Sequence, residues 1–137
     1  MSEGKRILIT GGAGSCGVFL TGSLLKSGYE VVVFDKDVKP VQSVADENLT
    51  VIEGLLEDRQ TTKKIDKGVD AVIHLAWSFS TDPMETLEVD LKGHINLLEE
   101  MAEQKTGHLI YTSTAVVYGK PGYSPINEDH PLIVEKA

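Results

Sequence analysis

Residues 5–17 read K-R-I-L-I-T-G-G-A-G-S-C-G, an apolar run rich in isoleucine that is followed by four glycines within seven positions. Gly12, Gly14 and Gly17 fit a G-x-G-x-x-G spacing, and Gly11, Gly14 and Gly17 fit the related G-x-x-G-x-x-G spacing. Glycine is required where a turn takes positive φ or where a ligand approaches the backbone too closely for a Cβ. The stretch therefore predicts a strand, a turn for a dinucleotide pyrophosphate, and a helix whose first amides favour negative charge.

The residues after the turn support this interpretation. Apolar residues recur at helical spacing before Ser27 and Gly28 end the helix: Val18, Phe19, Leu24 and Leu25. Residues 29–34 (Y-E-V-V-V-F) form a nearly continuous apolar run, as in a parallel strand that is buried on both faces. Asp35 ends that strand where a carboxylate can accept hydrogen bonds from an adenosine ribose. The acid favours NAD over NADP, whose 2′-phosphate it repels, although the next residue, Lys36, is a cation that would soften the preference.

Length and composition describe an ordinary globular domain. The 137 residues fit a single domain, and a hydrophobic content of 41% with one cysteine is typical of a reducing compartment. No stretch is apolar enough for a membrane span, and the N-terminus lacks a signal-peptide pattern. The formal net charge of -8 argues against nucleic acid as a partner. We expect a cytoplasmic protein.

The remainder of the chain alternates between strand and helix patterns. Strands are expected at residues 49–52, 69–76 and 108–112, with helices near 41–45 and at 56–67, the latter ending at Gly68. A long helix follows Asp82, which can cap it, and Pro83, which suits its first turn. The apolar residues of this helix make one stripe: Met84, Leu87, Leu91, Ile95, Leu98 and Met101.

This alternation predicts an α/β protein with a doubly wound parallel sheet, the Rossmann fold, of about five strands. In such sheets the ligand crevice lies beyond the carboxyl ends of the strands. Four segments are therefore expected to meet at one cofactor site: residues 11–17, Asp35, residues 76–78 and residues 113–114. We expect residues 1–137 to form one NAD-binding domain.

Several segments together resemble a known family. T-G-G-A-G-S-C-G, V-V-V-F-D, G-V-D-A-V-I-H-L-A, D-L-K-G-H-I-N-L-L-E, Y-T-S-T-A-V-V-Y-G and P-I-N-E-D-H-P occur in this order along nearly the whole chain. They are similar to the NAD-dependent epimerase/dehydratase branch of the extended short-chain dehydrogenases. The V-Y-G and N-E-D-H-P segments most resemble nucleotide-sugar epimerases and dehydratases.

The resemblance implies roles for particular residues. Thr114 aligns with a catalytic Ser or Thr that hydrogen-bonds the reacting sugar oxygen, and Ser113 is its neighbour near the cofactor. Tyr118 is assigned to packing. In the family's reaction, a sugar hydroxyl is oxidised by hydride transfer to NAD, and the keto intermediate is then rearranged or reduced. The implied cofactor-binding residues are Thr10, Gly11, Gly12, Ala13, Gly14, Ser15, Cys16, Gly17, Asp35, Lys36, Leu75, Ala76 and Trp77.

The chain also departs from the family pattern. The family's acid/base tyrosine has a lysine four residues later, and no tyrosine of this chain has one. The resemblance therefore implies the N-terminal part of a longer enzyme, without the sixth strand and the substrate region, and a chain that binds NAD but is catalytically incompetent alone. Leu55 follows Gly54 where the family often has an adenine-binding Asp, Asp58 lies three positions later, and Asp90 replaces the usual Asn.

Alternative functions remain open at this point. One is an NAD(P)-dependent reductase or dehydrogenase of the same superfamily, and another is a non-catalytic dinucleotide-sensing module. The histidines show no metal-ligand spacing, so no metal is expected, and we interpret His74 as a core residue. Cys16 is expected to fill a tight packing position. The edge of the last strand should be exposed and invite pairing, so a homo-oligomer is possible.

Overall fold

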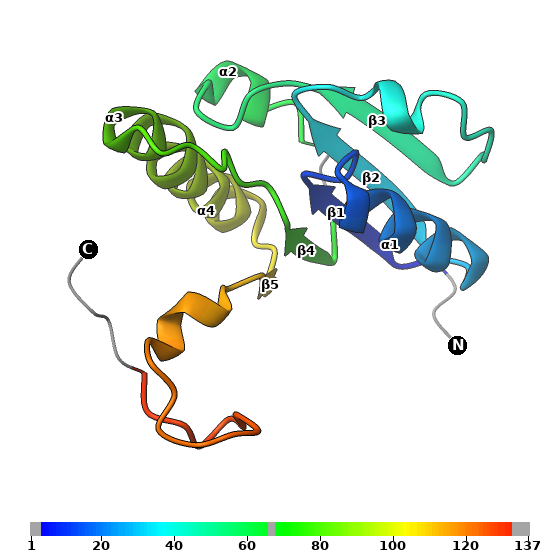
Figure 1. Ribbon diagram of the computed structural model, residues 1–137. Helices are drawn as coiled ribbons and strands as arrows, with labels where there is room; N and C mark the ends of the chain where they lie inside the picture. Colours follow the sequence, from blue (N-terminus) through cyan, green and yellow to red (C-terminus); the bar gives the residue numbers. More distant parts are fainter. Residues whose placement is uncertain (1–3, 66–67, 133–137) are drawn as a thin grey trace.

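The computed structural model describes residues 4–65 and 68–132, in which five parallel strands form one sheet with helices on both faces (Figure 1). The spatial order of the strands is β3-β2-β1-β4-β5, and every neighbouring pair is parallel. This confirms the predicted doubly wound sheet. The strands are β1 (Arg6–Thr10), β2 (Glu30–Asp35), β3 (Leu49–Glu53), β4 (Ala71–His74) and β5 (His108–Tyr111).

The central strands are buried on both faces because helices cover both. Successive side chains of a strand point to opposite faces, so β1 and β2 contribute alternate residues to two cores. The core beneath α1 (Ser15–Lys26) contains Ile7, Ile9, Ala13, Val31, Val33, Val38 and Val41. The core beneath α4 (Gly93–Gln104) contains Leu8, Val32, Phe34, Leu56, Ile65, Val69, Val72, Leu97 and Met101.

The long helix of the second face is built from three consecutive segments. They are α3 (Pro83–Glu85), the π-helical segment η2 (Thr86–Lys92) and α4. The Asp82 carboxylate accepts a hydrogen bond from the Met84 amide at 2.8 Å, and Pro83 occupies the first turn, as predicted. Helix α1 also ends where expected, since Ser27 is its C-cap and Gly28 has φ +81.

The short helices differ from the prediction. Helix α2 spans only Arg59–Thr62, because the Asp58 carboxylate accepts from the Gln60 amide at 2.9 Å and starts the helix there. Part of the predicted helix, residues 66–67, lies outside the described residues. The 3-10 turn η1 (Lys39–Val41) begins two residues before the expected short helix, and η3 (Ala115–Tyr118) was not predicted.

The apolar stripe of the long helix lies largely in solvent. Five of its six members are exposed, from Met84 at 65% to Leu98 at 41%, and only Met101 is buried. The buried face of α4 instead consists of Gly93, Asn96, Leu97, Glu100 and Met101. Gly93 explains why this face of α4 is the buried one. A Cβ on Gly93 would lie 2.9 Å from Leu56 Cβ, so only a glycine lets α4 approach Leu56 this closely.

Strand β5 ends the sheet on one side and is poorly covered. Its residues are exposed or half-buried, and Ile110 is 57% exposed. The chain that follows, orange to red in Figure 1, runs away from the sheet rather than along this edge. This segment forms an aromatic cluster of its own around the buried His130. The ring centroid of His130 lies 5.5 Å from that of Tyr118 and 4.7 Å from that of Tyr123.

Two adjacent leucines test which face of α4 packs. Leu97 is 1% exposed and Leu98 is 41% exposed. We expect L97A to lower the free energy of unfolding by about 2–5 kcal/mol, because it leaves a cavity in the core. The matched variant L98A should lower the free energy of unfolding by less than about 1 kcal/mol. Urea denaturation measures both, and equal losses would contradict the observed helix orientation.

The β5 edge should promote self-association of the chain. Sedimentation velocity at increasing concentration should show species larger than a monomer. A charge at the edge should shift the equilibrium toward monomer, so I110K is the test variant. V44K is the control, because Val44 is also exposed but precedes the opposite edge strand, β3. A wild-type chain that stays monomeric at every concentration would refute this expectation.

Candidate functional site

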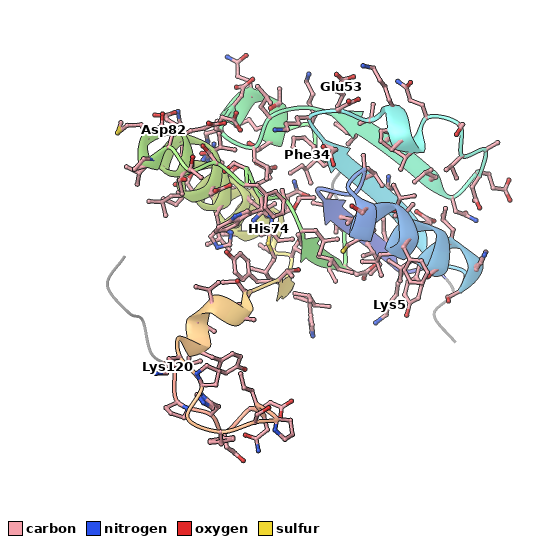
Figure 2. All side chains as sticks on the ribbon, in the orientation of Figure 1. Lys5, Phe34, Glu53, His74, Asp82 and Lys120 are labelled. Carbon is pink, nitrogen blue, oxygen red and sulfur yellow. The ribbon has the colours of Figure 1, made fainter. Side chains whose placement is uncertain are left out.

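A pocket of about 500 Å³ lies at the carboxyl ends of the strands. The segments that follow β1, β2, β3 and β4 line it, and Glu85, Val89 and Asp90 of the long helix complete it. Phe34 and His74 mark this end of the sheet, whereas Lys5 lies at the opposite end (Figure 2). The volume is in the range of ordinary small-molecule and cofactor sites.

The glycine turn is packed too tightly for side chains. Gly11 has φ +70, and a Cβ on it would lie 2.6 Å from the Ala76 nitrogen. A Cβ on Gly17 would lie 2.5 Å from the Gly11 carbonyl oxygen, and one on Gly12 would meet Val33 at 2.8 Å. These contacts join β1, α1 and the end of β4, which explains the predicted need for glycine.

The N-terminus of α1 opens toward this pocket. Its N-cap, Gly14, has no side chain to accept from the first amides, and the first turn contains no acidic residue. Four N–H groups at a helix start have no partner within the helix, and the dipole adds partial positive charge. A Cβ on Gly14 would meet only the Gly11 carbonyl, at 3.3 Å. The cradle therefore fits a pyrophosphate.

Asp35 links the glycine turn to the second strand. Its Oδ2 accepts a hydrogen bond from the Ala13 amide at 2.9 Å, and its Oδ1 accepts from the Asp37 amide at 3.3 Å. The Gly11 amide donates to the Phe34 carbonyl at 2.9 Å. A carboxylate has about four acceptor positions, so Asp35 retains capacity for ribose hydroxyls.

The structure brings eight of the predicted cofactor-binding residues into the pocket wall. These are Gly11, Ala13, Gly14, Asp35, Lys36, Leu75, Ala76 and Trp77. The other five do not line it: Thr10, Gly12, Ser15, Cys16 and Gly17. Thr10, Gly12 and Gly17 are buried beneath the turn, and Ser15 is exposed. The packing role expected for Cys16 was wrong, because it is exposed on the first turn of α1.

The two predicted catalytic residues lie outside the pocket. Ser113 and Thr114 follow β5, are exposed, and do not belong to the pocket lining. Thr114 is the N-cap of η3, where its Oγ1 accepts from the Val116 amide at 3.3 Å. The crevice that the described residues form is thus bounded by the segment after β3 rather than by the segment after β5.

Two parts of the pocket wall were not predicted from the sequence. Residues 54–57 after β3 and Asp90 of η2 both line the pocket. Asp90 accepts from the Ser78 amide at 2.8 Å and from the Ser78 hydroxyl at 2.7 Å, so it fastens the segment after β4 to the long helix. Leu55 and Asp90 depart from the family pattern, and those departures were the available signal.

His74 is a core histidine, as predicted. It is 4% exposed, and its Nδ1 lies 2.6 Å from the Thr10 hydroxyl oxygen directly beneath the glycine turn. Its ring centroid is 5.1 Å from that of His94 and 5.5 Å from that of Tyr111. Burial, followed by the nearby His94, lowers the pKa of His74 from 6.5 to about 4, while Asp90 opposes the shift. The ring is therefore neutral at pH 7.

Among the described residues, no group of three His, Cys, Asp or Glu side chains is placed to hold a metal ion. Within the same ranges, 4–65 and 68–132, no helix combines the length and apolar character needed to cross a bilayer.

Comparison with known proteins agrees with this architecture. Residues 7–135 match the model of the NAD dependent epimerase/dehydratase family. The chain is 33% identical over 142 residues to UDP-glucose 4-epimerase of Neisseria meningitidis serogroup A, a match that covers 93% of this chain.

Solved structures show the same fold. An epimerase from Methanothermobacter thermautotrophicus superposes with a TM-score of 0.83 at 30% identity over 97% of this chain. UDP-glucose 4-epimerase from Bifidobacterium longum, in complex with NAD+ and UDP, superposes with a TM-score of 0.81 at 26% identity over 93% of this chain. The chain spans 42% of the length of each of these two proteins and of the Neisseria enzyme.

The buried His74 makes stability depend on pH. The unfolded chain binds a proton near pH 6.5, whereas the folded chain binds it only near pH 4. Stability is therefore complete above pH 6.5 and falls as the pH drops toward 4, by about 1–3 kcal/mol. Urea denaturation between pH 7 and 4 should show a smaller decline in H74N than in the wild type.

The control for this experiment is H108N, which removes a histidine that is exposed on β5. It should retain the wild-type decline. An H74N protein that loses stability over this pH range as steeply as the wild type would exclude His74 as the source.

Proposed function

Because the chain belongs to the NAD-dependent epimerase/dehydratase family, we propose that residues 1–137 form a domain that binds NAD in the pocket at the carboxyl ends of β1 to β4. One observation carries the proposal: the Ala13 amide of the glycine turn donates to the Asp35 carboxylate at 2.9 Å. This bond holds a pyrophosphate cradle and a ribose acceptor on the same side of one pocket, which is the spacing that an adenosine diphosphate needs.

Each part of the pocket then has a role. The turn at residues 11–17 and the first amides of α1 hold the pyrophosphate. Asp35 accepts hydrogen bonds from the adenosine ribose, and Lys36 lies beside it. Leu75, Ala76 and Trp77 form the wall at the end of β4. Thr10 supports the turn from below through its contact with His74.

The charge of the pocket favours NAD over NADP. Asp35 and Asp37 follow β2, and Lys36 is the single Lys or Arg side chain among the described lining residues. A 2′-phosphate would therefore meet two carboxylates and one ammonium group. The repulsion of like charges at short range disfavours NADP.

The longer protein implied by the family would act on a nucleotide sugar. When bound, NAD would supply a reversible hydride acceptor for oxidation of a sugar hydroxyl to a ketone. Thr114, with Ser113 beside it, would hydrogen-bond the reacting sugar oxygen. Support comes from relatives named as UDP-glucose 4-epimerases, of which this chain spans 42% in the Neisseria case. A cytoplasmic location is part of the proposal, in keeping with the single cysteine.

The chain by itself is proposed to be catalytically incompetent. No tyrosine in it is followed four residues later by lysine, so nothing in the sequence combines a tyrosine base with the cation that lowers its pKa. Ser113 and Thr114 also lie outside the pocket. These observations equally favour a second candidate, a dinucleotide-sensing module without catalysis. A reductase or dehydrogenase of the same superfamily is a further alternative.

Calorimetric titration tests cofactor binding. We expect the chain to bind NAD, and to bind NADP at least about tenfold more weakly because of Asp35. D35A should weaken NAD binding by roughly tenfold, since a charged hydrogen bond contributes about 1.5–3 kcal/mol. D129N is the matched control, because Asp129 is exposed in the tail and does not line the pocket. The absence of any response to millimolar NAD would refute the proposal.

An activity assay tests the proposed catalytic incompetence of the chain. The purified chain, incubated with NAD and UDP-glucose, should yield no UDP-galactose above the buffer blank. Measurable turnover would overturn the proposed incompetence while leaving cofactor binding intact.

A further inference from the structure

Phe79, in the segment after β4, combines two features that do not help the chain to fold. Its side chain is 86% exposed, so the ring gains nothing from burial in a core. Its backbone has φ +55, in the left-handed region that a bulky residue rarely adopts because its Cβ comes too close to a carbonyl oxygen. Residues held in such conformations concentrate at ligand-binding sites.

The serines on either side of Phe79 hold its backbone in place. The Ser78 amide and hydroxyl donate to the two carboxylate oxygens of Asp90 at 2.8 and 2.7 Å. The Ser80 amide donates to Ser78 Oγ at 3.2 Å, and the Ser80 hydroxyl donates to Glu85 at 2.7 Å. Both carboxylates belong to the long helix. The strained residue is therefore fastened to this helix from both sides.

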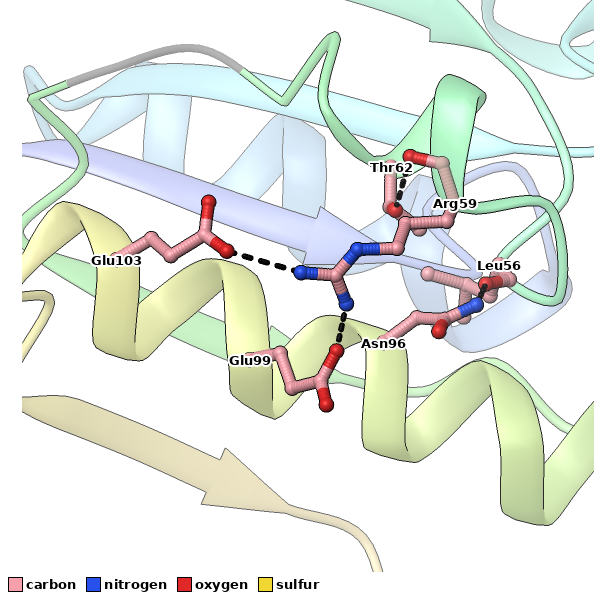
Figure 3. A network of polar contacts seen from close by, with 6 residues as sticks. All are labelled: Leu56, Arg59, Thr62, Asn96, Glu99 and Glu103. Carbon is pink, nitrogen blue, oxygen red and sulfur yellow. Dashed lines mark hydrogen bonds and ion pairs between the residues drawn. The ribbon is translucent and has the colours of Figure 1, made fainter.

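The long helix is itself anchored to the rest of the domain. The buried Asn96 side chain donates from Nδ2 to the Leu56 carbonyl at 2.8 Å (Figure 3). Farther along, the Arg59 guanidinium pairs with Glu99 and with Glu103, which ties α2 to α4 (Figure 3). The two serines after β4 are thus bound to a fixed support.

The exposed ring stands at the candidate cofactor pocket. Phe79 lines this pocket together with Trp77, which is 49% exposed and is the single tryptophan of the chain. The glycine turn and Asp35 line the same pocket. Exposed aromatic side chains offer a face on which a planar heteroaromatic ring stacks, and a dinucleotide contains two such rings.

We propose that Phe79 is a binding residue whose ring stacks on a heteroaromatic ring of the bound dinucleotide. The inference rests on the proposed function. Binding removes the exposed face of Phe79 from water, so the ligand complex rather than the free chain is stabilised by this ring. The hydrogen-bonded serines present the ring in advance, which reduces the ordering that binding requires.

Calorimetric titration with NAD tests the role of the ring. F79A removes the ring but keeps a Cβ, and it should weaken NAD binding by about fivefold or more, the usual effect of losing one stacking partner. F79Y keeps the ring and should bind NAD within about twofold of the wild type. F19A is the matched control, because Phe19 is 79% exposed on α1 but does not line the pocket. Its Kd for NAD should equal that of the wild type.

Thermal unfolding of F79G separates a ligand-binding role from a structural one. Glycine adopts positive φ without strain, so the unfolding midpoint should stay unchanged or rise while NAD binding weakens by about fivefold or more. K105G is the control for the backbone effect, because Lys105 is the other described non-glycine residue with positive φ, at +61. It should keep or raise the midpoint and leave the Kd for NAD unchanged. A lower midpoint in F79G would show that the ring supports the fold and would overturn the proposal.

ADP-ribose, which contains adenine but no nicotinamide, identifies the ring that stacks. If F79A weakens ADP-ribose as much as NAD, the ring is adenine, and if only NAD is weakened, the ring is nicotinamide. If the wild type binds NAD and F79A binds it equally well, the inference is wrong and the proposed function stands. If the wild type binds no NAD, both fail.

Discussion

The structure depends on one close approach, in which the glycine turn brings β1, α1 and the end of β4 together. At Gly11 and Gly17 a single added carbon would fall 2.5–2.6 Å from backbone atoms, a distance that no side chain accommodates without movement of the main chain. The same approach places the Ala13 amide within hydrogen-bond distance of Asp35 and packs Gly11 against Ala76. Fold and candidate site thus share one steric requirement.

A second constraint lies on the other face of the sheet, where α4 packs with a mixed rather than an apolar surface. Gly93 permits contact with Leu56, and Asn96 satisfies a carbonyl that would otherwise be buried without a partner. Such a bond adds only about 1 kcal/mol to stability, whereas losing it leaves a buried acceptor unpaired at a cost of about 1–3 kcal/mol. The consequence is positional, because this bond ties residues 54–57, which line the pocket, to α4.

Much of the architecture could be predicted from the sequence. The parallel doubly wound sheet follows from alternating strand and helix patterns and right-handed crossovers. Asp82, Pro83 and Gly28 are local signals whose effect does not depend on distant residues. The prediction failed where two local rules competed. Asp58 capped a helix within the stretch read as a longer one, and η3 formed because Thr114 caps a short turn after β5.

The sequence by itself determined the fold class, the glycine turn and the acid that faces it, because steric and hydrogen-bonding demands over a few residues permit few alternatives. Only the tertiary structure decided which residues reach the pocket. It buried Leu97 and left most of the apolar stripe of the long helix in solvent, brought residues 54–57 into the pocket wall, and kept Thr114 outside. These outcomes depend on how closely elements far apart in the chain approach each other, and that distance is set by packing, which no local pattern encodes.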